Sequence, residues 1–186
     1  QFASSTVSIS FWVNPATISN NYVLLGNGNG GSFADGDNDI FLRSDGYIGY
    51  ELGQSSSIYE AKYATTTQLT ANAWNNVILT YDSSLGTNIT KVYVNGVEQS
   101  LLATYTAGGT FSGDVFIGTL DYHIGKRNLS TLFFDGIIDE VRIYSDVLTS
   151  TEVGYIHNNT TASIPTDNLT AYYKLDGDAR DEQQLY

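Results

Sequence analysis

The chain has 186 residues with 20 acidic and 8 basic side chains, which gives a formal net charge of −12. Such a charge repels phosphate groups, so it argues against nucleic acid and anionic membranes as partners and is compatible with divalent cations. The sequence contains no cysteine, which excludes disulfides, thiolate metal sites and thiol catalysis. No apolar run approaches the roughly 20 residues of a membrane-spanning helix, so we expect no membrane insertion.

Length and composition suit one all-β domain with a sizeable core, because Gly is frequent and only 2 Pro are present. The sequence has no methionine, and its first residue is Gln1. Either a signal sequence was removed before this residue or the chain is an excerpt of a longer protein. Both alternatives fit an exported protein, so we expect a secreted or cell-surface location.

The first half of the chain alternates between apolar and polar residues, as strands do. Residues 6–13 place four apolar side chains on one face of a predicted strand. These side chains are Val7, Ile9, Phe11 and Val13. Further short strands are predicted at residues 22–25, 40–43, 47–52 and 59–63. The sequence Ser44-Asp45-Gly46 predicts a tight hairpin between two of them.

Residues 35–39 read Asp-Gly-Asp-Asn-Asp, a spacing that resembles the start of a calcium loop. An EF-hand would have Gly where this chain has Ile40, and Glu where it has Gly46. We therefore favour a solvated turn for this segment. The glycine-rich residues 26–31 predict a loop, which is not a phosphate-binding loop because no Lys-Ser or Lys-Thr pair follows it.

The second half contains the clearest pair of strands, at residues 74–81 and 91–98. Asn95-Gly96 between alternating residues requires a type I′ turn. Residues 114–118 and 122–125 predict two more strands.

A strand at residues 134–144 is followed directly by a helix start. Asp139 and Glu140 interrupt the alternation of this strand, which indicates a bulge or an acidic pair turned toward a ligand. Thr149 and Glu152 have the spacing of a reciprocal capping box. We expect one short helix that runs to about His157.

Several of these motifs resemble the laminin-G-like family. They are F-D-G-I-I-D-E-V-R-I-Y with its Leu-Thr-x-x-Glu helix, W-N-N-V-I-L-T-Y-D and V-Y-V-N-G, and they cover roughly residues 6–158. The resemblance implies an all-β, two-sheet antiparallel jelly-roll sandwich of the concanavalin A-like type, with one short helix near the C-terminal third. This fold hosts lectins, adhesion modules, enzyme accessory domains and some glycosidases, so the resemblance alone does not decide the function.

The C-terminal segment departs from the family pattern. Residues 1–159 form the expected sandwich, residues 160–168 have linker composition, and residues 169–186 supply a further strand and an acidic turn. A strand of the type A-Y-Y-x-L-D-G opens the domain in the resembled family, whereas here it closes the chain and only five residues precede the first predicted strand. The side chains expected to form the pairing face of this strand are Leu169, Ala171, Tyr173 and Leu175.

Three arrangements would give the displaced strand a partner, because an unpaired apolar strand is costly in water. It completes its own sandwich in cis, it begins a truncated second repeat, or it completes the sandwich of a neighbouring copy in trans. We favour the arrangement in trans, since donor strand and vacancy are both present. A head-to-tail contact of this kind does not close, so it predicts a filament.

The sequence predicts a protein that is not an enzyme. The glycosidases of this fold need an E-x-D-x-x-E-like strand that places two carboxylates on one face, and residues 138–141 do not supply it. His123 and His157 have neither a nucleophilic serine nor metal-ligand spacing nearby.

The best candidate for a metal site is the C-terminal acidic turn. Asp176, Asp178 and Asp181 place three carboxylates in six residues around a glycine turn, which suits a hard cation with oxygen ligands. The family resemblance implies a structural calcium at this motif. Asp139 or Asp135 would complete the coordination if the terminal strand pairs beside the closing strand; the alternative is a solvated acidic tail.

Exposed aromatic side chains would stack on sugars. The expected glycan contacts are Tyr47, Tyr59 and Tyr122, from a wider set that also includes Trp12, Tyr22, Tyr50 and Tyr105. Two functions therefore stand side by side. One is a structural or adhesive module that assembles with copies of itself through strand exchange, and the other is a calcium-dependent carbohydrate-binding module of a larger surface protein whose partners are glycans.

Overall fold

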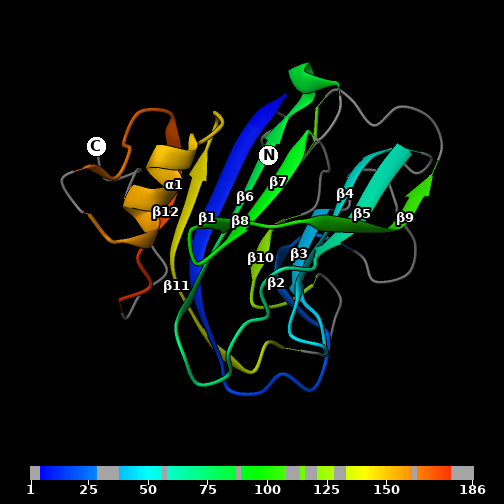
Figure 1. Cartoon of the computed structure of the whole chain (residues 1–186), viewed down its shortest axis with the longest axis vertical. Helices are drawn as coiled ribbons and strands as arrows, with labels where there is room; N and C mark the ends of the chain where they lie inside the picture. Colours follow the sequence, from blue (N-terminus) through cyan, green and yellow to red (C-terminus); the bar gives the residue numbers. More distant parts are fainter. Residues whose placement is uncertain are drawn as a thin grey trace.

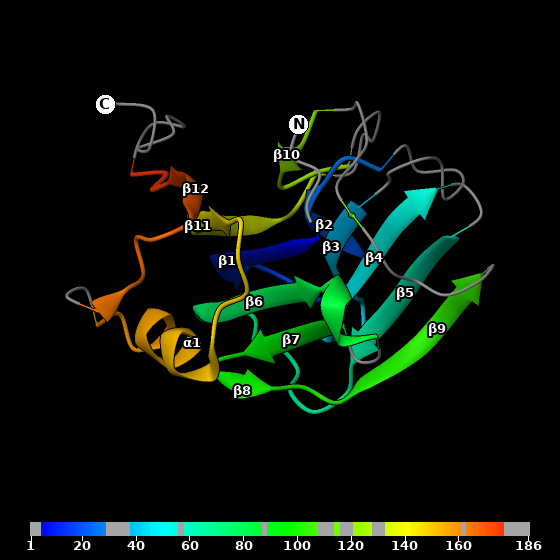
Figure 2. The same cartoon turned by 90° about the horizontal axis from the view of Figure 1, so that it is seen from above.

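The computed structural model describes residues 5–28, 38–55, 58–86, 89–107, 114–115, 121–127, 133–160 and 163–176. Two antiparallel sheets of six strands each pack against one another, and one short helix lies against the outer face of the first sheet (Figures 1 and 2). The predicted all-β sandwich with a single short helix is therefore confirmed.

Each sheet combines strands that follow one another in sequence with strands that are distant in sequence. The first sheet has the order β12 (Leu169–Tyr173), β11 (Gly136–Tyr144), β1 (Thr6–Pro15), β6 (Asn75–Asp82), β7 (Thr90–Val94) and β8 (Val97–Glu98). The second sheet has the order β10 (His123–Ile124), β2 (Tyr22–Gly26), β3 (Asn38–Leu42), β4 (Ile48–Ser55), β5 (Ile58–Ala64) and β9 (Leu101–Ala107). A 3-10 turn, Ser83–Leu85, follows β6.

The core lies between the sheets, and β1 shows why. The four apolar residues predicted to share a face, Val7, Ile9, Phe11 and Val13, are at most 1% exposed and belong to the main core. The residues between them, including Ser8, Ser10 and Trp12, face outward because successive side chains of a strand point to opposite sides of the sheet. Because these four side chains are buried in the core, only the opposite face of β1 is available to a ligand.

The predicted turns occur where the sequence places them. Asn95 and Gly96 have φ angles of 51° and 76°, which are the two left-handed residues of a type I′ turn between β7 and β8. A Cβ atom added to Gly96 would lie 2.9 Å from Cδ2 of His157, so this turn also packs against the end of the helix. Residues 44–46 join β3 to β4 as a hairpin.

Helix α1 (Ser150–His157) begins with the predicted capping box. The Thr149 hydroxyl accepts a hydrogen bond from the Glu152 amide, and the Glu152 carboxylate accepts one from the Thr149 amide. Val153 and Ile156 pack on the outer face of the first sheet, in a cluster with Ile78, Tyr93, Tyr144 and Leu148. The last residues of the helix are thereby held above β1 and β6.

The predicted bulge in β11 is confirmed. Ser10 pairs with Arg142 and Trp12 pairs with Asp139, so three residue steps on β11 lie opposite two on β1. Glu140 takes up the additional residue with a left-handed φ of 54°.

Strand β12 pairs antiparallel with β11 of its own chain, at Val141 to Tyr144. Ala171, Tyr173 and Leu175 pack against the main core, while Leu169 packs against the helix cluster. The Ser145 amide donates to the Asn168 carbonyl at 2.8 Å, which closes the segment after β11 back onto the sheet edge. The strand therefore has its partner in cis, and our preference for pairing in trans finds no support in the structure.

Three further expectations need correction or comment. Strand β9 was not predicted, although residues 103–107 alternate between apolar and polar side chains as a strand does. Asp39 is not part of a solvated turn, since it is 1% exposed and pairs with Arg127. Of the predicted strand at residues 114–118, only residues 114–115 are described, and Val115 is fully buried. Among the described residues, no helix is long and apolar enough to cross a membrane.

Candidate functional site

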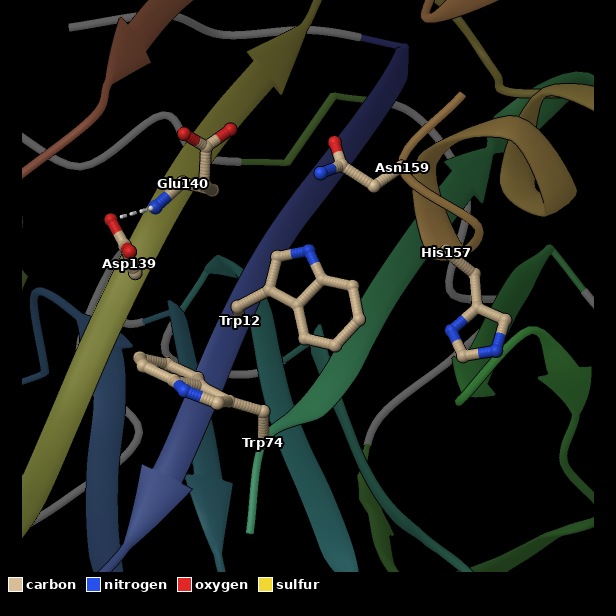
Figure 3. A pocket seen from close by; sticks show the side chains of 6 residues that line it. All are labelled: Trp12, Trp74, Asp139, Glu140, His157 and Asn159. Atoms are coloured by element: carbon tan, nitrogen blue, oxygen red, sulfur yellow. Dashed lines mark hydrogen bonds between the residues drawn. The ribbon is translucent and has the colours of Figure 1, made fainter. Parts of the chain in front are cut away.

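An open pocket of about 300 Å³ lies on the outer face of the first sheet, beside the end of α1 (Figure 3). It is lined by Trp12, Trp74, Asp139, Glu140, His157 and Asn159. These residues come from β1, the position before β6, the bulge of β11, and the C-terminal end of α1 with the turn that follows it. Segments distant in sequence therefore build one concave surface with aromatic, acidic and amide groups.

The two tryptophans are the only ones in the chain. Trp12 is an outward residue of β1, and its ring stacks on the His157 ring with centroids 6.0 Å apart and an interplanar angle of 19°. Trp74 directly precedes β6 and is 44% exposed. Two indoles so placed offer apolar surface to a ligand in water.

The acidic wall opposite α1 depends on the bulge. In a regular strand Asp139 and Glu140 would point to opposite faces, whereas here both line the pocket (Figure 3). The Glu140 amide donates to Oδ1 of Asp139 at 2.8 Å. Partial burial raises the pKa of Asp139, and the nearby Glu140 and Asp176 carboxylates raise it further.

Behind this wall, Glu140, Arg142 and Tyr172 form a compact group that we call the Tyr172 cluster. The Tyr172 hydroxyl lies 2.9 and 2.7 Å from the two carboxylate oxygens of Glu140 and accepts from Nη2 of Arg142 at 2.9 Å. The same guanidinium pairs with Glu140 and lies over the Tyr172 ring, 4.3 Å from its centroid. Burial, followed by the hydrogen bond to Glu140, raises the pKa of Tyr172 above its ordinary value. Through Tyr172, the C-terminal strand thus holds Glu140 of the acidic wall in position.

A second charged group lies on the outer face of the second sheet. Arg127 pairs with both Asp39 and Glu51, and Oδ1 of Asp39 accepts from the Gly28 amide at 3.1 Å. A Cβ on Gly26 would lie 1.8 Å from that oxygen, so the carboxylate packs directly on the backbone of β2. Because Arg127 pairs with both acids, we interpret this group as a structural tie between β3, β4 and the segment after β10.

The predicted metal ligands are only partly described. Asp139 and Asp176 lie within electrostatic reach of one another, as expected if β12 pairs beside β11. Asp178 and Asp181 lie outside the described residues. In the part of the chain that the structure describes, no group of three or more potential ligands could hold a metal ion. Calcium at this turn remains a prediction.

The three tyrosines expected to contact glycans do not line the pocket. Tyr59 is 8% exposed on β5, Tyr122 packs against the core, and Tyr47 is half-buried in the turn before β4. Their role as glycan contacts stays a prediction. Tyr50 of the wider set is fully buried and donates to Glu60.

Sequence reasoning found part of this pocket. The acidic pair of β11 and Trp12 were among the candidates, whereas Trp74, His157 and Asn159 were not. Trp74 could have been found, because a tryptophan at the end of a turn, next to a strand that carries Asn76 and Thr80 on its outward face, is a candidate for ligand stacking. No sequence signal places residues 157 and 159 beside β1.

Several solved structures share this fold. A candidate carbohydrate-binding protein from Bacteroides ovatus ATCC 8483 matches 98% of this chain with a TM-score of 0.65 and 22% identity, and this chain spans 50% of its length. The CBM40 of the Ruminococcus gnavus IT-sialidase, bound to α2,3 sialyllactose, matches over 83% of each chain with a TM-score of 0.62 and 20% identity. Domain 4 of AbnA, a GH43 extracellular arabinanase from Geobacillus stearothermophilus, in complex with arabinotriose, has a TM-score of 0.52 and 21% identity over 82% of this chain and 66% of its own.

At these identities the likeness establishes the fold alone. No curated protein is similar enough to this sequence to count as a match. A family model, in contrast, matches residues 1–154, which is most of the chain and includes β1 to β11 and the start of α1. The chain therefore belongs to the Laminin_G_3 family of the concanavalin A-like lectin/glucanases superfamily.

Proposed function

We propose that this chain is an exported, non-enzymatic glycan-binding module that holds a sugar in the pocket between β11 and α1. The observation that carries the proposal is that both tryptophans of the chain line one open pocket together with two carboxylates and an amide. Small-molecule sites typically combine aromatic walls with a few placed polar groups, and a volume of about 300 Å³ is at the lower end of their range. Such a volume suits one sugar unit, with the rest of a glycan extending past the exposed Trp74.

The polar groups of the pocket match the hydroxyl groups of a sugar. Asp139 and Glu140 offer acceptor oxygens, while the Asn159 amide offers both donors and an acceptor. The sugar's apolar C–H face would lie on an indole, as its hydroxyls reach the acidic wall. The B. ovatus, R. gnavus and G. stearothermophilus structures support sugar binding on this fold. Sialyllactose is anionic, however, and among the described residues that line this pocket there is no Lys or Arg, so an uncharged sugar suits it better than an anionic one.

The arrangement favours binding over hydrolysis. Glycosidases place two carboxyl groups on either side of the scissile bond, roughly 5 to 9.5 Å apart, one of them as an acid. Here the two carboxylates are adjacent in sequence, and Glu140 is already bound by Arg142 and Tyr172. His157 stacks on Trp12 and has no described nucleophile beside it in the pocket.

Glycan-array screening followed by calorimetric titration of the full chain tests the proposal. We expect Trp74→Ala to weaken glycan binding at least about tenfold, the loss of one stacked aromatic, with little change in melting temperature because Trp74 is 44% exposed. The matched control is Phe133→Ala, which removes a 63% exposed aromatic that does not line the pocket. Unchanged affinity in Trp74→Ala, or equal losses in both variants, would contradict the proposal.

A structural calcium is a second element of this proposal, favoured by the approach of Asp176 to Asp139. Asp139 and Asp176 would hold the ion together with Asp178 and Asp181 of the acidic turn. The ion would neutralise repulsion between these carboxylates and tie the end of β12 to the acidic wall. Calcium would then affect glycan binding through the position of Asp139.

A further inference from the structure

In the absence of the calcium ion proposed above, the described residues of the pocket carry an unbalanced negative charge. Glu140 has a counterion, since Arg142 pairs with it and Tyr172 hydrogen-bonds to it. Asp139 forms no ion pair in the part of the chain that the structure describes, and its Oδ1 accepts from the Glu140 amide. The Glu140 and Asp176 carboxylates repel its charge, whereas the Arg142 guanidinium attracts it. A ligand with a positive charge would remove this imbalance.

The aromatic groups strengthen the same preference. Trp74 lies near Asp139 in the pocket, and Trp12 lies between the acidic pair and His157 (Figure 3). The face of an indole attracts a cation, and tryptophan does so better than the other aromatic residues. Two indoles beside a carboxylate without a described counterion form a site for an ammonium group on an otherwise apolar ligand surface.

We propose that the preferred ligand is a glycan with a free, positively charged amino group, and that Asp139 is the residue that selects it. This inference rests on the proposed glycan binding and names the class of sugar. The ammonium group would donate hydrogen bonds to Asp139 and contact the two indoles, while the ring hydroxyls bind Asn159 and the rest of the wall. Acetylation of the amine removes both its charge and two of its donors, so an N-acetylated sugar of the same shape binds more weakly.

Three matched oligosaccharides test this inference by calorimetric titration in chelator-containing buffer. They are a glucosamine trimer, its N-acetylated form, and a glucose trimer with the same linkage. We expect the wild-type chain to bind the amine form about five- to tenfold more tightly than the other two, the size of one cation–π contact and one exposed carboxylate contact together. A lysine trimer of equal charge separates an amino sugar from a bare amine, and we expect it to bind more weakly than the amino sugar.

The variant Asp139→Asn keeps an acceptor for the Glu140 amide but removes the charge, so we expect it to bind all three sugars alike. The matched control is Asp45→Asn, which lowers the net negative charge equally at a site where Asp45 pairs with Arg43 away from the pocket. It should retain the preference for the amine. Equal loss of the preference in both variants would assign it to the overall charge and overturn the inference.

Failure of the inference is distinct from failure of the proposed function. If the N-acetylated and glucose forms bind as tightly as the amine form and Trp74→Ala weakens all three, glycan binding stands and the amine preference is wrong. If the lysine trimer binds as well as the amino sugar, the assignment to a sugar is wrong. If none of the three sugars binds, the amine preference is wrong, and the glycan-array screen decides the proposed glycan binding separately.

Discussion

Removal of the Tyr172 hydroxyl tests whether the C-terminal strand stabilises the acidic wall. In Tyr172→Phe, Glu140 and Arg142 each lose a hydrogen bond to this hydroxyl, while their own ion pair remains. A hydrogen bond to a charged group contributes about 1.5–3 kcal/mol. The Glu140 side chain is 28% exposed, so water can replace part of the lost hydrogen bonding. We therefore expect the free energy of unfolding to fall by about 1.5–3 kcal/mol for the two hydrogen bonds together. For a chain of this length this corresponds to a melting temperature lower by about 3–12 °C.

Differential scanning calorimetry measures this effect, with Tyr155→Phe as the control. Tyr155 is 38% exposed on α1, so removal of its hydroxyl should change stability by no more than about 0.5 kcal/mol. The affinity of Tyr172→Phe for a bound glycan should also fall, because Glu140 loses part of the support for its position in the pocket. If both variants melt within one degree of the wild type, the Tyr172 cluster makes no net contribution and the reasoning is refuted.

Three further predictions concern charge, metal and assembly. Because the pKa of Asp139 is raised above its usual 3.8, the ionised form is disfavoured in the folded state without calcium. In chelator-containing buffer, Asp139→Asn should therefore raise the melting temperature at pH 7 and lose this gain below pH 3.8; an equal gain at both pH values would contradict this. If calcium binds the acidic turn, a hundredfold excess over its dissociation constant stabilises the chain by about 2.7 kcal/mol, whereas an unchanged melting temperature in chelator and in Asp181→Ala would leave a solvated tail. Light scattering should find a monomer at all concentrations, since β12 pairs in cis. Deletion of residues 169–186 should lower stability and promote association. If the full-length chain is instead an oligomer and this deletion makes it monomeric, pairing in trans would be supported.

Local sequence patterns predicted most of the fold. The alternation of β1, the Asn95-Gly96 turn and the capping box at Thr149 each depend on residues within a few positions of one another, and all three are confirmed. The bulge was predicted for the same reason, because Asp139-Glu140 is a local break in alternation. Strand β9 was missed although residues 103–107 alternate, because the sequence does not show its pairing with β5, which lies far away along the chain.

The pocket depends on long-range contacts, and sequence reasoning recovered less of it. Trp12 and Trp74 meet only because β1 pairs with β6, and His157 reaches Trp12 only because α1 packs on the sheet. Local sequence predicts a solvated Asp39, because its partner Arg127 lies far along the chain. The sequence showed that the C-terminal strand needs an edge, but the choice between its own sheet and that of a copy depends on how the intervening residues fold.

The family match ends at residue 154, whereas the pocket includes His157 and Asn159, and Tyr172 braces its wall. The matched sandwich supplies the two tryptophans and the bulge of the pocket. The segment beyond the match supplies the opposite side of the pocket and the tyrosine that supports its acidic wall. Two proteins with the same sandwich can therefore differ in ligand preference through this last segment alone. Exchange of residues 155–186 between members of the family would then be a direct route to altered specificity without redesign of the core.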